Sequence, residues 1–105
     1  MLKAIMNVRF FPKDSDLYKD WEGYDATRVF RPAFNIGGAL YSASITSDEQ
    51  MYFWNEAYTV WVDFFTIDSW ELYINIKKYL VVGEKYNIQA ASKIIGEAIM
   101  YDFMF

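Results

Sequence analysis

Apolar and polar residues alternate with a period of two along most of the chain. The alternation predicts strands over residues 4–10, 41–45, 60–64, 72–76 and 86–90, each with one face in the core. A further strand is predicted over 94–101, where both faces are apolar apart from Glu97. Aromatic residues make up 21% of the sequence, and they favour such pleated surfaces.

Turn signals separate these runs. Gly37-Gly38 predicts a hairpin between residues 34–36 and 40–41. Residues 83–85 separate two further apolar runs, and residues 91–93 link the last two predicted strands. Pro32 lies inside an apolar segment, so we expect it at a strand start, an edge or a bulge. We expect residues 12–27 to form a long loop, and residues 47–55 to form a loop or one helical turn.

Length and strand count together predict the fold class. A chain of 105 residues is the size of one domain, so we assign residues 1–105 to a single unit. Six or seven short strands in that length predict an all-β sandwich or barrel. We favour a small antiparallel β-barrel, because closure removes the exposed edges through which so aromatic a chain would aggregate.

Three segments carry a family resemblance in their order and spacing. They are Phe-Arg-Pro-Ala-Phe at 30–34, Val-Trp-Val-Asp-Phe-Phe at 60–65, and Gly-Glu-Lys-Tyr-Asn-Ile-Gln at 83–89 followed by Lys-Ile-Ile-Gly-Glu at 93–97. Together they resemble the C-terminal β-barrel domain of translation elongation factor Tu, over about residues 4–101. The resemblance implies a Tu-like barrel, with structural roles for Arg31, Pro32, Phe34, Gly83 and Gly96.

The first long loop departs from this family. There the loop approaches tRNA and tends to carry glycines and basic residues. Here it carries five acidic residues against Lys13 and Lys19, namely Asp14, Asp16, Asp20, Glu22 and Asp25. This difference argues against tRNA binding, while the implied barrel is unaffected.

The composition excludes several kinds of chemistry. The chain has no Cys and no His, so it can form no disulfide, thiolate nucleophile, Cys/His zinc site or Ser-His pair. Counted from Asp14, the acidic loop places Lys19 where a calcium-binding EF-hand loop needs Gly. We therefore predict no enzyme, no metal site and no cofactor. A deep pocket holding two close carboxylates would revive a carboxylate enzyme.

Charge is segregated along the chain. No Lys or Arg occurs between Arg31 and Lys77, whereas this stretch holds acidic residues among many aromatics. The alternation places Trp61 and Asp63 on one face of a strand, opposite Val60 and Val62. The candidate partner-binding residues are Glu49, Trp54, Glu56, Tyr58, Trp61, Asp63, Asp68, Trp70 and Glu71. Burial in the core is the alternative for the three tryptophans.

These features predict a non-enzymatic protein-binding module. We expect an immunity protein or antitoxin that neutralises a basic toxin, for example a nuclease, by covering it with an acidic and aromatic face. The alternative is a translation-associated Tu-like barrel that binds tRNA, the ribosome or elongation factor Tu itself. A net charge of −4 argues against nucleic acid, and an exposed aromatic stripe could also pair two copies as a homodimer. No apolar run reaches the ~20 residues that span a membrane, so we expect a cytoplasmic protein.

Overall fold

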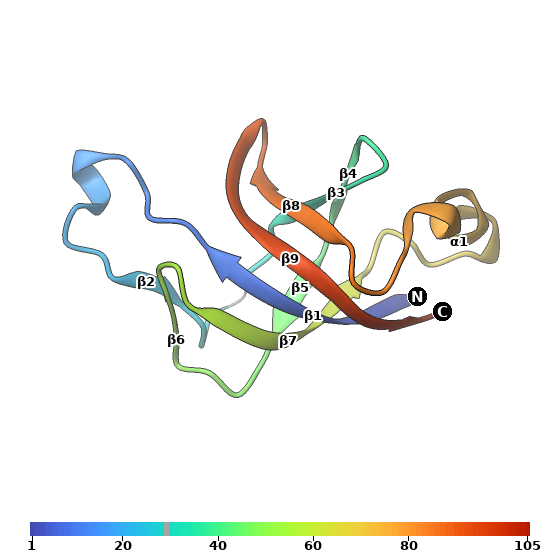
Figure 1. The fold of residues 1–105 in the computed structure, drawn as a ribbon, viewed down its shortest axis with the longest axis horizontal. Helices are drawn as coiled ribbons and strands as arrows, with labels where there is room; N and C mark the ends of the chain where they lie inside the picture. The colour runs from blue at the N-terminus through green and yellow to red at the C-terminus, as the bar shows by residue number, and fades with distance from the viewer. Residues whose placement is uncertain (29) are drawn as a thin grey trace.

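The computed structural model describes residues 1–28 and 30–105. Seven antiparallel strands form one sheet that curls into a half-barrel (Figure 1). In spatial order they are β4 (Ala39–Ser42), β3 (Ala33–Ile36), β8 (Lys85–Ala90), β9 (Lys93–Met104), β1 (Leu2–Phe10), β7 (Ala57–Phe64) and β5 (Ser44–Thr46). The predicted small antiparallel β-fold is therefore confirmed.

Strand β1 lies inside the sheet, between β7 and β9. Its alternation separates two faces as the sequence predicted: Leu2, Ala4, Met6, Val8 and Phe10 are buried in the core. The intervening residues point to the outer face of the sheet. The same alternation on β7 buries Val60, Val62 and Phe64, so the outer face of β7 lies beside the outer face of β1.

The two edge strands, β4 and β5, are consecutive stretches of one segment, joined at Ala43. Ala43 is fully buried, and its N–H donates to the carbonyl oxygen of Pro32 at 3.0 Å. The N–H of Ile45 donates to the carbonyl oxygen of Phe30 at 3.2 Å, while β5 pairs with β7 on its other side. The two ends of the sheet therefore meet in residues 39–46. Pro32 immediately precedes β3, one of the positions expected for it.

The hairpin predicted at Gly37-Gly38 connects β3 to β4. Both glycines have positive φ, 62° and 90°, which the tightest hairpin turns require and which glycine adopts without steric cost. The link predicted over residues 91–93 likewise joins β8 to β9.

A second, two-stranded sheet corrects two loop expectations. Strand β2 (Gly23–Asp25) pairs with β6 (Met51–Phe53), within segments that we expected to be a loop and a loop or helical turn, respectively. A 3-10 turn over Asp16–Tyr18 precedes β2. Three-residue strands are too short to show a period of two, so the sequence pattern could not reveal them. Tyr52 from β6 is buried, and its ring lies 5.4 Å from that of Phe10.

The strand predicted over residues 72–76 is wrong. The chain there forms helix α1 (Trp70–Ile76), followed by a 3-10 turn over Lys77–Tyr79. Ser69 caps the helix, because its hydroxyl accepts a hydrogen bond from the N–H of Leu72 at 3.2 Å. Tyr73 and Ile76, three residues apart, face the core, whereas Leu72 and Ile74 are each 45% exposed. No helix in the described residues has the length and hydrophobicity needed to cross a membrane.

Candidate functional site

Trp61 lies on the outer face of β7, next to Ile5 of β1 and Thr46 of β5 in the strand register. Its side chain is 58% exposed, because burial of Val60 and Val62 turns the intervening residue outward. This confirms that Trp61 faces away from the core, and the alternative of a strand buried on both faces is wrong.

Two shallow hollows flank the indole of Trp61. On one side Ser47, Asp48 and Glu49 line a hollow of about 290 Å³. On the other side Ile5, Phe103 and Met104 contribute to a hollow of about 220 Å³, which Lys3 and Asp102 also line. The indole therefore separates an acidic depression from a mainly apolar one. We call Trp61 and these two hollows the Trp61 face.

Asp63 lies two residues beyond Trp61 on the same side of β7. It is opposite Lys3 on β1 and Ser44 on β5, and it is partly exposed. Glu49 is exposed in the acidic hollow. Of the residues that the sequence predicted as partner contacts, Glu49 and Trp61 thus line one hollow, and Asp63 lies beside Trp61 on the same face of β7.

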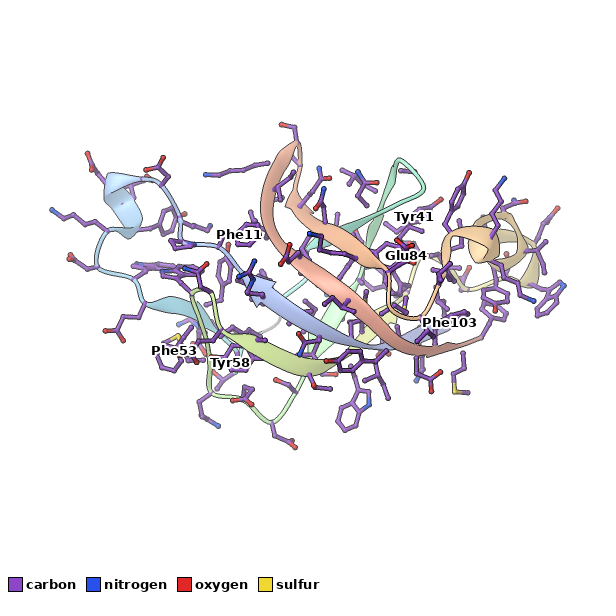
Figure 2. The ribbon with its side chains drawn as sticks, viewed as in Figure 1. Phe11, Tyr41, Phe53, Tyr58, Glu84 and Phe103 are labelled. Carbon is purple, nitrogen blue, oxygen red and sulfur yellow. The ribbon has the colours of Figure 1, made fainter. Side chains whose placement is uncertain are left out.

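A second group of predicted residues lies at the turn between β6 and β7. The hydroxyl of Tyr58 accepts a hydrogen bond from the N–H of Phe53 at 3.0 Å and donates to Oε2 of Glu56 at 3.1 Å. Phe53 and Tyr58 lie at the same end of the molecule (Figure 2). Desolvation of this hydroxyl raises the pKa of Tyr58 above its ordinary value. Trp54 is partly buried, and its indole N–H donates to the carbonyl oxygen of Trp21 at 2.8 Å. These contacts fix the turn.

The third group lies at the start of α1. Trp70 is 63% exposed, and its ring is 5.9 Å from that of Phe105. Asp68 and Glu71 beside it are exposed. Helix α1 and strand β6 lie at opposite ends of the molecule (Figure 1), so the predicted set forms no single surface.

The residues assigned to structural roles occupy distinct positions. Phe34 is fully buried, with its ring 5.3 Å from that of Phe64, and the exposed Arg31 lies over the ring of Phe65. Gly83 has a φ of 90° in the turn before β8. A Cβ atom on Gly96 would lie 2.5 Å from the carbonyl oxygen of Arg9.

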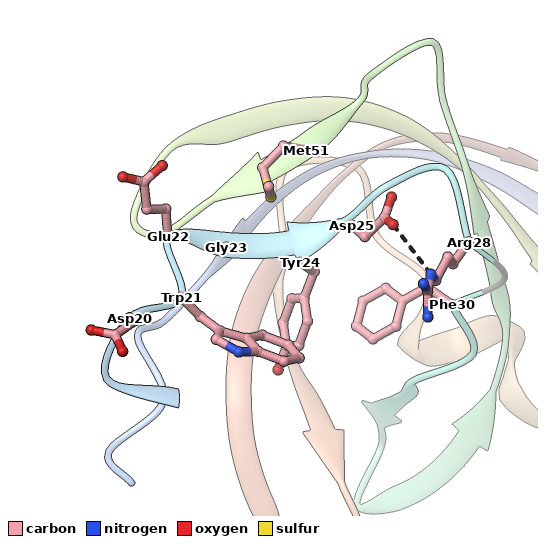
Figure 3. Close-up of a pocket in the computed structure, with 9 residues that line it drawn as sticks. All are labelled: Asp20, Trp21, Glu22, Gly23, Tyr24, Asp25, Arg28, Phe30 and Met51. Atoms are coloured by element: carbon pink, nitrogen blue, oxygen red, sulfur yellow. Dashed lines mark ion pairs between the residues drawn. The ribbon is translucent and has the colours of Figure 1, made fainter. Parts of the chain in front are cut away.

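Sequence reasoning missed a third hollow, beside β2. It measures about 570 Å³, and Trp21, Tyr24, Phe30 and Met51 contribute its apolar lining (Figure 3). Desolvation raises the pKa of Tyr24 to about 12. Tyr18, Trp21 and Tyr24 recur every third residue among acidic residues, and that spacing was the available signal. We call this feature the β2 hollow.

The carboxylates of the described residues do not converge on a metal. In residues 1–28 and 30–105, no group of three or more Asp or Glu could hold a metal ion. At the β2 hollow, Asp25 accepts hydrogen bonds from the hydroxyl and the N–H of Thr27 and pairs with Arg28. The Thr27 hydroxyl, followed by its N–H, holds the pKa of Asp25 below its ordinary value.

Comparison with models of known protein families finds no match for this chain, and comparison with curated protein sequences finds none either. The resemblance to elongation factor Tu therefore stays a prediction from short motifs.

Proposed function

We propose that this chain is a non-enzymatic protein-binding module whose Trp61 face covers a basic partner. The function we favour is that of a cytoplasmic immunity protein or antitoxin, and the partner is a basic toxin such as a nuclease. The observation that supports the proposal is a tryptophan left 58% exposed on β7, beside the edge strand β5, between an acidic hollow and an apolar one.

An exposed tryptophan in this setting suits an interface anchor. Tryptophan is enriched among the residues that dominate binding energy, and such anchors work best when surrounding contacts exclude water. Ile5, Phe103 and the 68% exposed Met104 supply apolar surroundings on one side of the indole. A partner that covers this apolar side and the acidic hollow opposite it would exclude water from both sides of the indole.

The charges beside Trp61 favour a basic partner. Asp48 and Glu49 line the acidic hollow. Asp63 lies two residues after Trp61 on β7, and Lys3 of β1 is opposite Asp63. Acidic groups around an anchor speed the encounter with a basic surface and oppose binding of nucleic acid. A toxin that binds nucleic acid presents the complementary basic surface.

The test is affinity capture from the native cell with matched variants, followed by an activity assay. The first variant combines Trp61→Ala with Asp63→Lys, and the matched control combines Trp70→Ala with Glu71→Lys at the other end of the molecule. We expect one basic protein at stoichiometric level, lost with the first variant and retained with the control. The purified partner should lose its toxic activity when the wild-type chain is added.

The expected magnitude follows from interface energetics. Truncating a central tryptophan costs about 2 kcal/mol or more of binding energy, which raises the dissociation constant about thirtyfold or more. Asp63→Lys should act mainly on the association rate, and more strongly at low salt. Recovery of tRNA or translation factors, indifferent to the first variant, would contradict the proposal and favour the translation-associated alternative.

A further inference from the structure

The β2 hollow is built on a rigid support. The N–H of Trp21 donates to the carbonyl oxygen of Tyr18 at 2.9 Å, and the carbonyl oxygen of Trp21 accepts the indole N–H of Trp54 at 2.8 Å. The rings of Tyr24 and Phe30 are 4.8 Å apart. These contacts fix the backbone of Trp21, and its side chain stays 49% exposed (Figure 3).

Aromatic rings on this protein attract its own cations. Lys13 Nζ lies 4.3 Å from the ring centroid of Tyr18 and 5.2 Å from that of Tyr24. Arg9, Arg31, Lys77 and Lys78 lie over other rings in the same way. Within the described part of the chain, none of these cations lies over Trp21 or Phe30. Trp21, which is 49% exposed, is therefore available to a cation from outside, and tryptophan offers the strongest such contact.

The charge around the hollow favours a cation as well. Three carboxylates and one guanidinium line it, a balance of −2. Arg28 pairs with Asp25 at 3.3 Å, at the Phe30 end of the hollow. Asp20 and Glu22 lie at the other end, and neither forms an ion pair in the described residues. Their negative charge is therefore left to attract an incoming group.

We propose that the β2 hollow binds an arginine side chain presented by a partner protein. A guanidinium is planar and weakly hydrated, so it stacks on aromatic faces while donating hydrogen bonds to carboxylates. Trp21 supplies the aromatic face, and Asp20 or Glu22 supplies the acceptor. The inference goes beyond the proposed function, because it concerns a separate surface and needs no contact with Trp61.

The test is an NMR titration of the ¹⁵N-labelled chain with two small probes. N-acetylarginine amide carries the guanidinium, and N-acetylcitrulline amide has nearly the same shape without the charge. Each indole N–H signal is assigned by replacing its own tryptophan. We expect arginine amide to shift the Trp21 signal while leaving Trp70 unchanged, and citrulline amide to shift neither. Equal shifts with both probes would overturn the proposal.

Matched variants complete the test. Trp21→Ala should weaken arginine amide binding by roughly two- to fivefold, whereas Trp70→Ala, which removes another exposed tryptophan, should not change it. Because Trp21→Ala could disturb the fold, the Asp20→Asn, Glu22→Gln double variant provides a second route that keeps every ring. It should weaken binding and reduce its salt dependence. Unchanged affinity in both variants would refute the proposal without bearing on the capture experiment above. A shift centred on Trp61 would also refute it, because the cation would then bind at the Trp61 face.

Discussion

The hydroxyl of Tyr86 ties the segment that follows α1 to the sheet. Tyr86 lies on β8 and is only 7% exposed. Its hydroxyl accepts a hydrogen bond from the N–H of Val81 at 3.0 Å and donates to the carbonyl oxygen of Tyr79. A single oxygen atom thus satisfies one backbone donor and one backbone acceptor. We predict that Tyr86→Phe destabilises the protein chiefly by removing these two bonds.

The structure sets the size of this effect. A typical hydrogen bond contributes about 0.5–1.5 kcal/mol net, and a buried group left without a partner costs about 1–3 kcal/mol. Val81 is 46% exposed, so water can reach the freed backbone groups in part. The phenyl ring keeps the packing of the tyrosine. We therefore expect a loss of about 1–2 kcal/mol in the free energy of unfolding.

Urea unfolding and amide hydrogen exchange measure this loss. The urea midpoint should fall without a change in slope, and the Val81 amide should exchange faster than in the wild-type protein. Tyr101→Phe is the matched control, because Tyr101 is 48% exposed on the outer face, and its effect should stay within about 0.5 kcal/mol. If Tyr86→Phe keeps wild-type stability and the Val81 amide keeps its protection, the Tyr86 hydroxyl does not stabilise this segment and the prediction is wrong.

Three other predictions test separate features. Gly96→Ala places a Cβ atom 2.5 Å from the carbonyl oxygen of Arg9 in the paired strand, so urea unfolding should show a loss of about 1–3 kcal/mol. Tyr24 has its pKa raised to about 12 from 10.0, so its neutral form is favoured in the folded state. Its contribution to the free energy of unfolding is fully present below pH 10 and disappears as the pH rises towards 12. Absorbance at 295 nm follows the ionisation and circular dichroism follows the fold, with Tyr24→Phe as the reference. Trp61→Ala should change the free energy of unfolding, measured by thermal unfolding, by less than about 0.5 kcal/mol, because a 58% exposed side chain leaves no cavity when truncated. A larger loss would mean that Trp61 supports the fold.

Long alternating runs made most of the sheet predictable. Strands β1, β7, β8 and β9 each have six residues or more, enough for a period of two to separate buried from exposed positions. The same pattern failed over 72–76. There Leu72, Ile74 and Ile76 alternate with Tyr73, Asn75 and Lys77. There the Ser69 cap and the three-residue spacing of buried Tyr73 and Ile76 favour a helix, a local signal that the alternation concealed.

The outward position of Trp61 and Asp63 was predictable, because one strand fixes both. The division of the other candidate residues was not. At ~3.3 Å per residue, the eight residues of β7 extend over about 26 Å. Glu56 therefore lies at one end of this strand, and Asp68 follows its other end. Residues that appear as one acidic stretch in the sequence are consequently placed at opposite ends of the molecule. The spacing of Tyr18, Trp21 and Tyr24 was a local signal for the aromatic side of the β2 hollow, but the pairing of β2 with the distant β6 leaves no local pattern.

Because β4 and β5 share one segment, the strand registers at the two ends of the sheet are coupled. The Gly37-Gly38 turn fixes how β4 pairs with β3, and only Ala43 separates β4 from β5. A slip of one residue in the first hairpin would therefore slip β5 against β7 as well, turning the buried Ile45 of β5 outward. A glycine turn at one edge thus determines that Thr46, rather than its neighbour, lies beside Trp61 at the other.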